Sequence, residues 1–237
     1  MNRIAYMVIR NIFRVPVWFF GIWRLGRPGD KHTDQERYDY IRHIVKTVNR
    51  TGRVLVEVET IENLPEKSGF ILFPNHQGLF DVLALIEACP KPLSFVVKKE
   101  AAGIILIKQA KEALRGLSID RQDIKSSFTV IQKMIETVKQ GRNYIIFPEG
   151  TRSREGNKLL AFKGGTFKSA VGAQCPIVPV ALIDCFKPFD ENSIRKQKVS
   201  VCFLKPIYPE EYKGMKTTQI ASLVHEKIQD EINQKIG

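Results

Sequence analysis

The stretch GFILFPNHQGLFD, residues 69–81, joins a short apolar run to a polar turn and to the beginning of a helix pattern. The apolar residues 69–73 predict a buried strand, and Pro74 and Asn75 predict its end. A helix pattern follows from Leu79 to Cys89. A strand that runs through a turn into a helix is typical of α/β proteins, so the stretch predicts an α/β fold.

His76 lies in the predicted turn and Asp81 in the first turn of the predicted helix. On one continuous helix, a separation of five residues would put them roughly 140° apart, so their pairing requires a bend, which Gly78 permits. The positive helix end keeps the Asp81 carboxylate ionised and able to accept the imidazole N–H. The other ring nitrogen is then free as a base, as in the histidine and aspartate half of a serine hydrolase triad. A structural turn histidine is the alternative for His76 taken alone.

The sequence contains no serine in a G-x-S-x-G turn, so the attacking hydroxyl can belong to the substrate. A second polar cluster, in NYIIFPEGTRS at residues 143–153, follows another apolar run. Gly150 lets the backbone come close to a ligand, and Arg152 and Arg154 carry planar guanidinium groups suited to phosphate. The donor-rich segment 163–166 follows and opens the next helix pattern. The cluster predicts an anion site that holds a substrate hydroxyl at the histidine.

The same alternation of strands and helices continues along the chain. It predicts an α/β fold with a mixed, largely parallel sheet flanked by helices, and ligands at the carboxyl ends of the strands. Further strand patterns cover residues 53–60, 92–97, 117–120, 177–183 and 199–204, and further helix patterns cover 34–49, 101–114, 125–139, 166–173 and 218–236.

The first 29 residues contain five arginines, no acidic residue and the nine-residue apolar run Val15–Trp23. With a net charge of +12 and a pI near 9.6, this distribution favours an anionic membrane surface over nucleic acid as the partner. A crossing helix needs about 20 apolar residues, so the segment is predicted to lie in the interface, on the cytoplasmic face of the cell membrane. An ordinary core helix with a basic edge is the alternative.

The turn at Gly26–Asp30 breaks the amino-terminal pattern, and the helix predicted over residues 34–49 pairs with the first. We therefore expect a membrane-associating helical segment at residues 1–50 and a catalytic domain at 51–237. The four cysteines have no C-x-x-C spacing, which favours buried, reduced thiols. The four histidines are scattered without ligand spacing, so no metal is implied.

Four segments together resemble a known family. Asn75, His76 and Asp81 match the motif N-H-x4-D, and residues 147–153 match F-P-E-G-T-R-S without a gap. The segment GLSIDR at 116–121 is similar to a second family motif, and IVPVA at 177–181 to a fourth. The segments occur in family order, and the resemblance covers about residues 54–204. The chain resembles the glycerolipid acyltransferases, most closely the 1-acyl-glycerol-3-phosphate acyltransferases.

The resemblance implies that His76 is the general base and that Asp81 orients it. It also implies that the acyl donor is acyl-CoA or acyl-carrier protein, that no cofactor is bound, and that Arg152 holds the phosphate of lysophosphatidic acid. The substrate-binding set implied in this way is Lys98, Lys99, Arg121, Glu149, Gly150, Thr151 and Arg152.

Other interpretations of these residues stay open at the level of sequence. Lys98 and Lys99 would ordinarily be a solvated turn, and Glu149 is alternatively a structural partner of a nearby arginine. Asp120 and Arg121 are alternatively an internal ion pair.

The predicted activity is acyl transfer to the free hydroxyl of 1-acyl-glycerol 3-phosphate, giving phosphatidic acid. Glycerol 3-phosphate or another lysophospholipid is the first alternative as acceptor. A non-catalytic protein that binds anionic membranes or nucleic acid is the second alternative, although the chain has no recognised nucleic-acid-binding motif.

Overall fold

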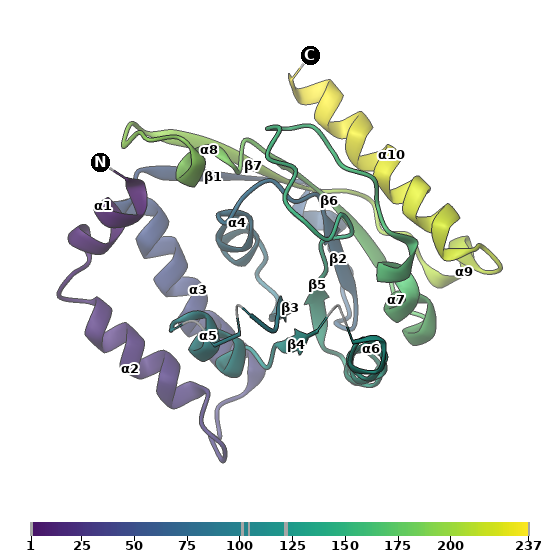
Figure 1. Ribbon diagram of the computed structural model, residues 1–237, viewed down its shortest axis with the longest axis horizontal. Helices are drawn as coiled ribbons and strands as arrows, with labels where there is room; N and C mark the ends of the chain where they lie inside the picture. The colour runs from purple at the N-terminus through teal and green to yellow at the C-terminus, as the bar shows by residue number, and fades with distance from the viewer. Residues whose placement is uncertain (1, 101, 104, 121–122, 237) are drawn as a thin grey trace.

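The computed structural model describes residues 2–100, 102–103, 105–120 and 123–236. A seven-stranded sheet with the order β1-β7-β6-β2-β5-β3-β4 forms its centre (Figure 1). The strands are β1 (Val54–Glu59), β2 (Ile71–Pro74), β3 (Leu93–Lys98), β4 (Leu117–Ile119), β5 (Asn143–Ile145), β6 (Ile177–Ile183) and β7 (Gln197–Phe203).

Helices surround this sheet. The α-helices are α1 (Arg3–Arg10), α2 (Val15–Leu25), α3 (Asp34–Thr51), α4 (Asp81–Ala88), α5 (Ile107–Ala113), α6 (Ile124–Lys139), α7 (Lys168–Ala173), α8 (Lys187–Asp190), α9 (Pro209–Tyr212) and α10 (Thr217–Ile236). The described residues also form the short 3-10 helices η1 (Ile61–Asn63) and η2 (Gly164–Phe167).

The sheet is mixed and largely parallel, as the sequence predicts. Strands β6, β2, β5, β3 and β4 run parallel to one another, whereas β7 is antiparallel to β6 and parallel to β1. The carboxyl ends of five strands therefore meet at one edge. Pro74 belongs to β2, aligned with Val180 of β6, so the expectation that the strand ends before this proline is wrong by one residue.

Two hydrophobic cores lie on the two faces of the sheet, and successive side chains of a central strand alternate between them. In β2, Leu72 packs into the core under α1 to α5, whereas Ile71 and Phe73 pack into the core under α6, α7 and α10. Figure 1 shows these two helical layers on either side of the strands. Because β6 faces both layers, all seven of its residues are buried.

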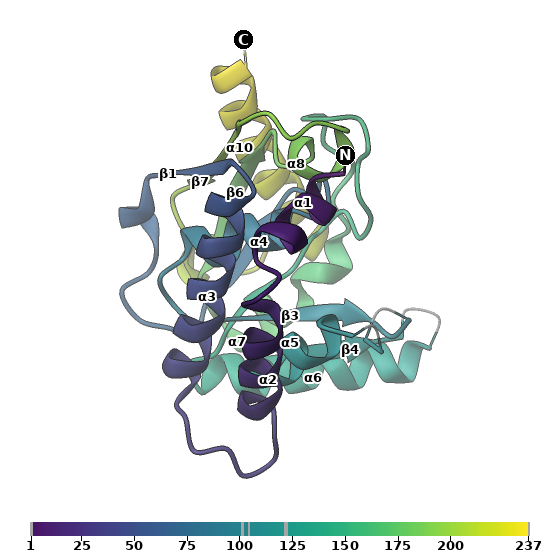
Figure 2. The same cartoon turned by 90° about the vertical axis from the view of Figure 1, so that its left-hand side faces the viewer.

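The amino-terminal segment folds as two helices, α1 and α2, that lie along α3 (Figure 2). Met7, Ile22 and Leu25 reach the core that the sheet shares with α3 and α4. Trp18 packs against this core while partly buried, and several other apolar side chains are exposed, with Phe13 at 93% exposure and Val17 and Phe20 above half. Among the described residues, no helix combines the length and the apolarity required to cross a bilayer.

The helix expected over residues 101–114 is shorter than predicted. Ala101 and Ile104 lie outside the described residues, and α5 begins at Ile107. Leu106, the residue before it, has a φ of +76°. Such a value is incompatible with a right-handed helix, so the chain cannot continue the helix backwards through this residue.

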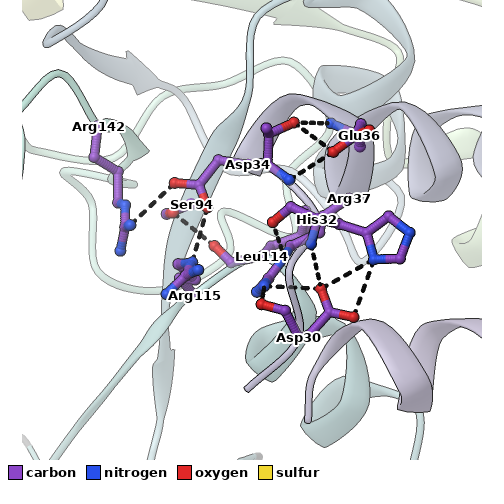
Figure 3. Close-up of polar contacts among 10 residues, drawn as sticks. Asp30, His32, Asp34, Glu36, Arg37, Ser94, Leu114, Arg115 and Arg142 are labelled. Carbon is purple, nitrogen blue, oxygen red and sulfur yellow. Dashed lines mark hydrogen bonds and ion pairs between the residues drawn. The ribbon is translucent and has the colours of Figure 1, made fainter. Parts of the chain in front are cut away.

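Ion pairs at the amino-terminal end of α3 join residues 1–50 to the rest of the chain. Asp34 pairs with Arg115 at 2.8 Å and with Arg142 at 3.0 Å (Figure 3). Arg115 lies two residues before β4 and Arg142 directly before β5, at the amino edge of the sheet. Asp30 pairs with Arg37 at 2.9 Å and shapes the turn that leads into α3.

Candidate active site

His76 and Asp81 pair at the carboxyl edge of the sheet. The Nδ1 atom of His76 lies 2.7 Å from Oδ2 of Asp81. The imidazole stacks on the ring of Phe147, with the ring centroids 4.0 Å apart. Its Nε2 makes no hydrogen bond within the described part of the chain, and the side chain is 20% exposed. The pair therefore presents one ring nitrogen to which a substrate hydroxyl has access.

Helix α4 begins at Asp81, two residues after the predicted start at Leu79, so Asp81 lies in the first helical turn as predicted. Its carboxylate is fully buried. Besides the imidazole, it accepts the backbone N–H of Gln77 at 2.6 Å and that of Gly78 at 3.0 Å. Burial raises the pKa of Asp81, while the His76 ring and these two amides act in the opposite direction. With all of its neighbours acting as donors, the carboxylate fixes the orientation of the imidazole.

Gly78 allows a close backbone approach in the histidine loop, rather than the bend that the sequence predicts for it. Its φ is not positive, so the bend does not depend on glycine's conformational freedom. Instead, a Cβ at this position would lie 3.2 Å from Cα of Phe186 and 3.5 Å from the carbonyl oxygen of Cys185. The absence of a side chain lets the histidine loop pack against the chain that follows β6.

Glu149 joins the two polar loops. Its carboxylate is 2% exposed, accepts the backbone N–H of His76 at 2.8 Å and accepts that of Leu160 at 3.3 Å. Burial raises its pKa to about 7. This geometry favours the structural alternative for Glu149 over substrate contact, with backbone amides as its partners where the sequence suggested an arginine.

The arginine-bearing loop lies directly against the histidine loop. The N–H of Ser153 donates to the carbonyl oxygen of His76 at 2.9 Å. Arg152, the preceding residue, and Arg154 line a cleft of about 390 Å³ together with Gly156, Phe186 and Asp190. Neither guanidinium makes a hydrogen bond or an ion pair with any described residue, so both are available to an anion.

One wall of this cleft packs against the histidine loop. Phe186 and Asp190 line the cleft, and Gly78 of the histidine loop packs against both residues. A Cβ added at Gly78 would lie 3.7 Å from Oδ2 of Asp190. The loops that carry His76 and Arg152 thus lie side by side, while the binding of one substrate by both side chains stays a prediction. A second, smaller cavity of about 70 Å³ lies at the opposite edge, beside Asp34 and Arg142.

An amide network supports the site, and sequence reasoning missed it. The side chain of Gln77 donates to Oδ1 of Asn157 at 2.7 Å and accepts the N–H of Cys185 at 2.8 Å. Asn157 in turn donates to Asp184 at 2.9 Å. These residues come from three loops far apart along the chain. The only sequence signal was a polar residue next to the histidine.

The two lysines lie further from the His76–Asp81 pair, beyond β5 in the sheet. Lys98 ends β3, which is separated from β2 by β5, and is exposed. Lys99 pairs with Asp120 at 3.3 Å, and Arg121 lies outside the described residues. Thr151 is exposed, and Gly150 has a φ of +73° in the arginine loop. Substrate contact by these residues stays a prediction.

A possible ligand set for a metal lies elsewhere in the described part of the chain. Carboxylate and thiol atoms of Glu59, Cys202 and Glu231 lie within 4.8 Å of one another. Lys235 pairs with Glu59 there, so a cation of the protein already neutralises part of this charge. All four cysteines are buried and unpaired, as predicted.

The profile of the Acyltransferase family matches residues 55–183, a segment that runs from β1 to the end of β6 and includes both loops of the site. This match covers more than half of the chain, and the chain belongs to the Acyltransferase family.

The individual proteins that the chain is similar to have names that specify an acyl acceptor. The chain is 29% identical over 181 residues to the chloroplastic 1-acyl-sn-glycerol-3-phosphate acyltransferase BAT2 of Brassica napus, covering 75% of this chain and 51% of that protein. It is 34% identical over 124 residues to the 1-acyl-sn-glycerol-3-phosphate acyltransferase of Helicobacter pylori, covering 52% of each. The matched region thus spans about half the length of these curated relatives.

The fold has a counterpart among solved structures. The crystal structure of the 1-acyl-sn-glycerophosphate (LPA) acyltransferase PlsC from Thermotoga maritima superposes with a TM-score of 0.76 and 22% sequence identity. The superposition covers 99% of this chain and 97% of that one. The α/β architecture described above is therefore that of a known acyltransferase.

Proposed function

We propose that this chain transfers a fatty acyl group from a thioester to the free hydroxyl of 1-acyl-glycerol 3-phosphate, giving phosphatidic acid. The observation that carries the proposal is that His76, backed by a buried carboxylate, lies on a loop packed against the arginine loop, whose two guanidinium groups line a cleft and have no partner among the described residues. The names of the relatives support lysophosphatidic acid as the acceptor.

The chemistry requires one base and no covalent acyl-enzyme. Nε2 of His76 accepts the proton of the acceptor hydroxyl while that oxygen bonds to the thioester carbonyl carbon. The carbon–sulfur bond then breaks, and the imidazolium returns the proton to the departing thiolate. Asp81 holds the ring and stabilises its positive charge during these steps. Arg152 and Arg154 bind the phosphate and so hold the hydroxyl at the imidazole.

The acceptor and the product are lipids, and we place the enzyme on an anionic membrane surface. The exposed apolar side chains of α1, α2 and the turn between them support this placement, together with the exposed arginines Arg10 and Arg14. An interfacial helix buries such apolar groups in the headgroup boundary, while its basic residues stay near the anionic lipids.

An acceptor panel tests the proposal. The purified chain is mixed with lysophosphatidic acid, glycerol 3-phosphate or lysophosphatidylcholine, and with palmitoyl-CoA or palmitoyl-carrier protein, and thiol release and lipid products are measured. We expect phosphatidic acid from lysophosphatidic acid and at least one donor, at a rate at least tenfold above the other acceptors. Equal use of lysophosphatidylcholine, or no thiol release with any pair, would contradict the proposal.

A further inference from the structure

Arg3 differs from the other arginines of the amino-terminal segment because it is buried, at 1% exposure. Its guanidinium donates three hydrogen bonds to backbone carbonyl oxygens. Nε donates to Pro188 at 3.0 Å, Nη1 to Gly52 at 2.7 Å and Nη2 to Arg195 at 2.7 Å. The expectation that Arg3 belongs to the membrane-facing charges is wrong, because its side chain points into the protein.

The carbonyl groups that Arg3 binds come from three separate connections. Gly52 lies between α3 and β1, Pro188 lies in α8, and Arg195 precedes β7. Met7 of α1 packs directly on Gly52: a Cβ added at Gly52 would lie 2.2 Å from the terminal methyl carbon of Met7. A buried guanidinium is costly unless its donors are satisfied, so the side chain is well placed only while all three connections keep their positions.

Helix α8 forms one wall of the candidate acceptor cleft. Phe186, the residue before it, and Asp190, its last residue, both line that cleft together with the arginines. Hydrogen bonds from two other parts of the protein hold this wall. Gln77 of the histidine loop accepts the N–H of Cys185, and Arg3 of α1 donates to the carbonyl oxygen of Pro188 on α8 itself.

We propose that Arg3 is a positioning residue for the acceptor site: by holding α8, it makes the shape of the phosphate cleft depend on the docking of α1. The inference rests on the proposed function, because α1 belongs to the surface that we place on the membrane. When α1 lies against the protein, α8 is fixed and the cleft has its binding shape. When α1 detaches, Pro188 loses its donor and the cleft wall loosens.

Steady-state kinetics of an Arg3→Ala variant tests this role with a short-chain, water-soluble lysophosphatidic acid, so that membrane binding does not enter the measurement. We expect the acceptor KM to rise at least fivefold, with kcat within threefold and the donor KM within twofold of wild type. Arg3→Lys should recover little, since an ammonium group cannot bind three carbonyls in the planar geometry of a guanidinium.

Asp34→Ala is the matched control. It also removes contacts between residues 1–50 and the rest of the chain, but at the opposite edge of the sheet. Its acceptor KM should stay within twofold of wild type. An unchanged acceptor KM in Arg3→Ala, or equal increases in both variants, would overturn the inference.

Hydrogen exchange of the wild type provides a second test that needs neither turnover nor a stable variant. The N–H groups of Phe189, Asp190 and Glu191 are hydrogen bonded within the α8 turn, so their exchange reports its opening. Vesicles of phosphatidylglycerol should slow this exchange at least threefold. Slower exchange in α1 with no change in α8 would overturn the inference, whereas a wild type that forms no phosphatidic acid would contradict the proposed function instead.

Discussion

Asp81 receives the imidazole and two backbone N–H groups on one buried carboxylate, so its charge and its two oxygens both matter. In Asp81→Asn the imidazole loses its ionised partner, and one backbone N–H faces an amide NH₂ group. We expect kcat to fall on the order of 10²- to 10⁴-fold. The free energy of unfolding should fall by about 1–3 kcal/mol, because a buried donor is left unsatisfied.

Turnover at saturating substrate and urea denaturation measure these two effects. Asp230→Asn on the exposed face of α10 is the control and should change neither quantity. An Asp81→Asn variant that keeps more than a tenth of wild-type kcat would argue against an orienting role for the carboxylate.

The raised pKa of Glu149 predicts that the protein becomes less stable to unfolding as the pH rises. Burial raises its pKa from 4.5 to about 7. The folded protein therefore holds this proton more tightly than the unfolded chain, so the contribution to stability is complete below a pH of about 4.5 and is lost as the pH rises through about 7. Relative to Glu149→Gln, the wild type should lose up to ~3 kcal/mol of unfolding free energy across this range.

Denaturant unfolding of both proteins at several pH values between 4.5 and 8 checks this expectation. Using the difference between the two proteins cancels most of the contribution of Asp81, whose pKa is raised in the same direction. If the unfolding free energy of the wild type minus that of Glu149→Gln is constant or increases with pH, the raised pKa of the buried Glu149 carboxyl is contradicted.

At this scale, the sequence predicted the residues whose chemistry is visible locally. His76 and Asp81 carry their roles in a single motif, and the geometry matches it. Gln77 and Asp190 were missed because their contacts join loops that lie about a hundred residues apart, and no periodic pattern marks such contacts.

Among the helices and strands, α1, α2 and the turn between them form the surface that we expect to bind the membrane. Phe13, Val17 and Phe20 are the most exposed apolar side chains of this segment. Burying one such side chain in an apolar medium contributes about 1.5–3 kcal/mol. Replacing all three with serine should therefore weaken binding to phosphatidylglycerol vesicles at least a hundredfold in a sedimentation assay.

Ile236→Ser is the control for this triple variant. Ile236 is also exposed, but it ends α10 on the other face of the sheet. It should leave vesicle binding unchanged. If the triple variant binds as the wild type does, the membrane contacts another surface.

The short elements were harder to predict than the long ones. The pattern of β6 matches its observed bounds, Ile177–Ile183, because burial on both faces gives an uninterrupted apolar run. Helix α8 was not predicted, since a four-residue helix has no periodicity to detect. Yet it forms a wall of the cleft, so the missing element was one that shapes the candidate site.

At the scale of the whole molecule, the net charge of +12 predicts salt-sensitive membrane association. Raising the ionic strength from about 0.05 to 0.5 M shortens the screening length several-fold. Binding to phosphatidylglycerol vesicles should weaken at least tenfold, while binding to phosphatidylcholine vesicles should change less than twofold. Equal sensitivity for both lipids would mean that the basic surface does not contact the anionic headgroups.

The α/β class and the parallel strands were predictable because alternating patterns along the chain imply them. The antiparallel direction of β7 was not, because strand direction depends on the path of the connection after β6. The site occupies the edge at which the parallel strands end, as the topology requires.

The most direct test of the central claim is the rate of phosphatidic acid formation by His76→Ala, measured beside the wild type with lysophosphatidic acid and an acyl thioester. We expect a loss on the order of 10³-fold or more in kcat, with the variant still folded and its vesicle binding unchanged. Formation of phosphatidic acid at more than a tenth of the wild-type rate would show that another group removes the proton.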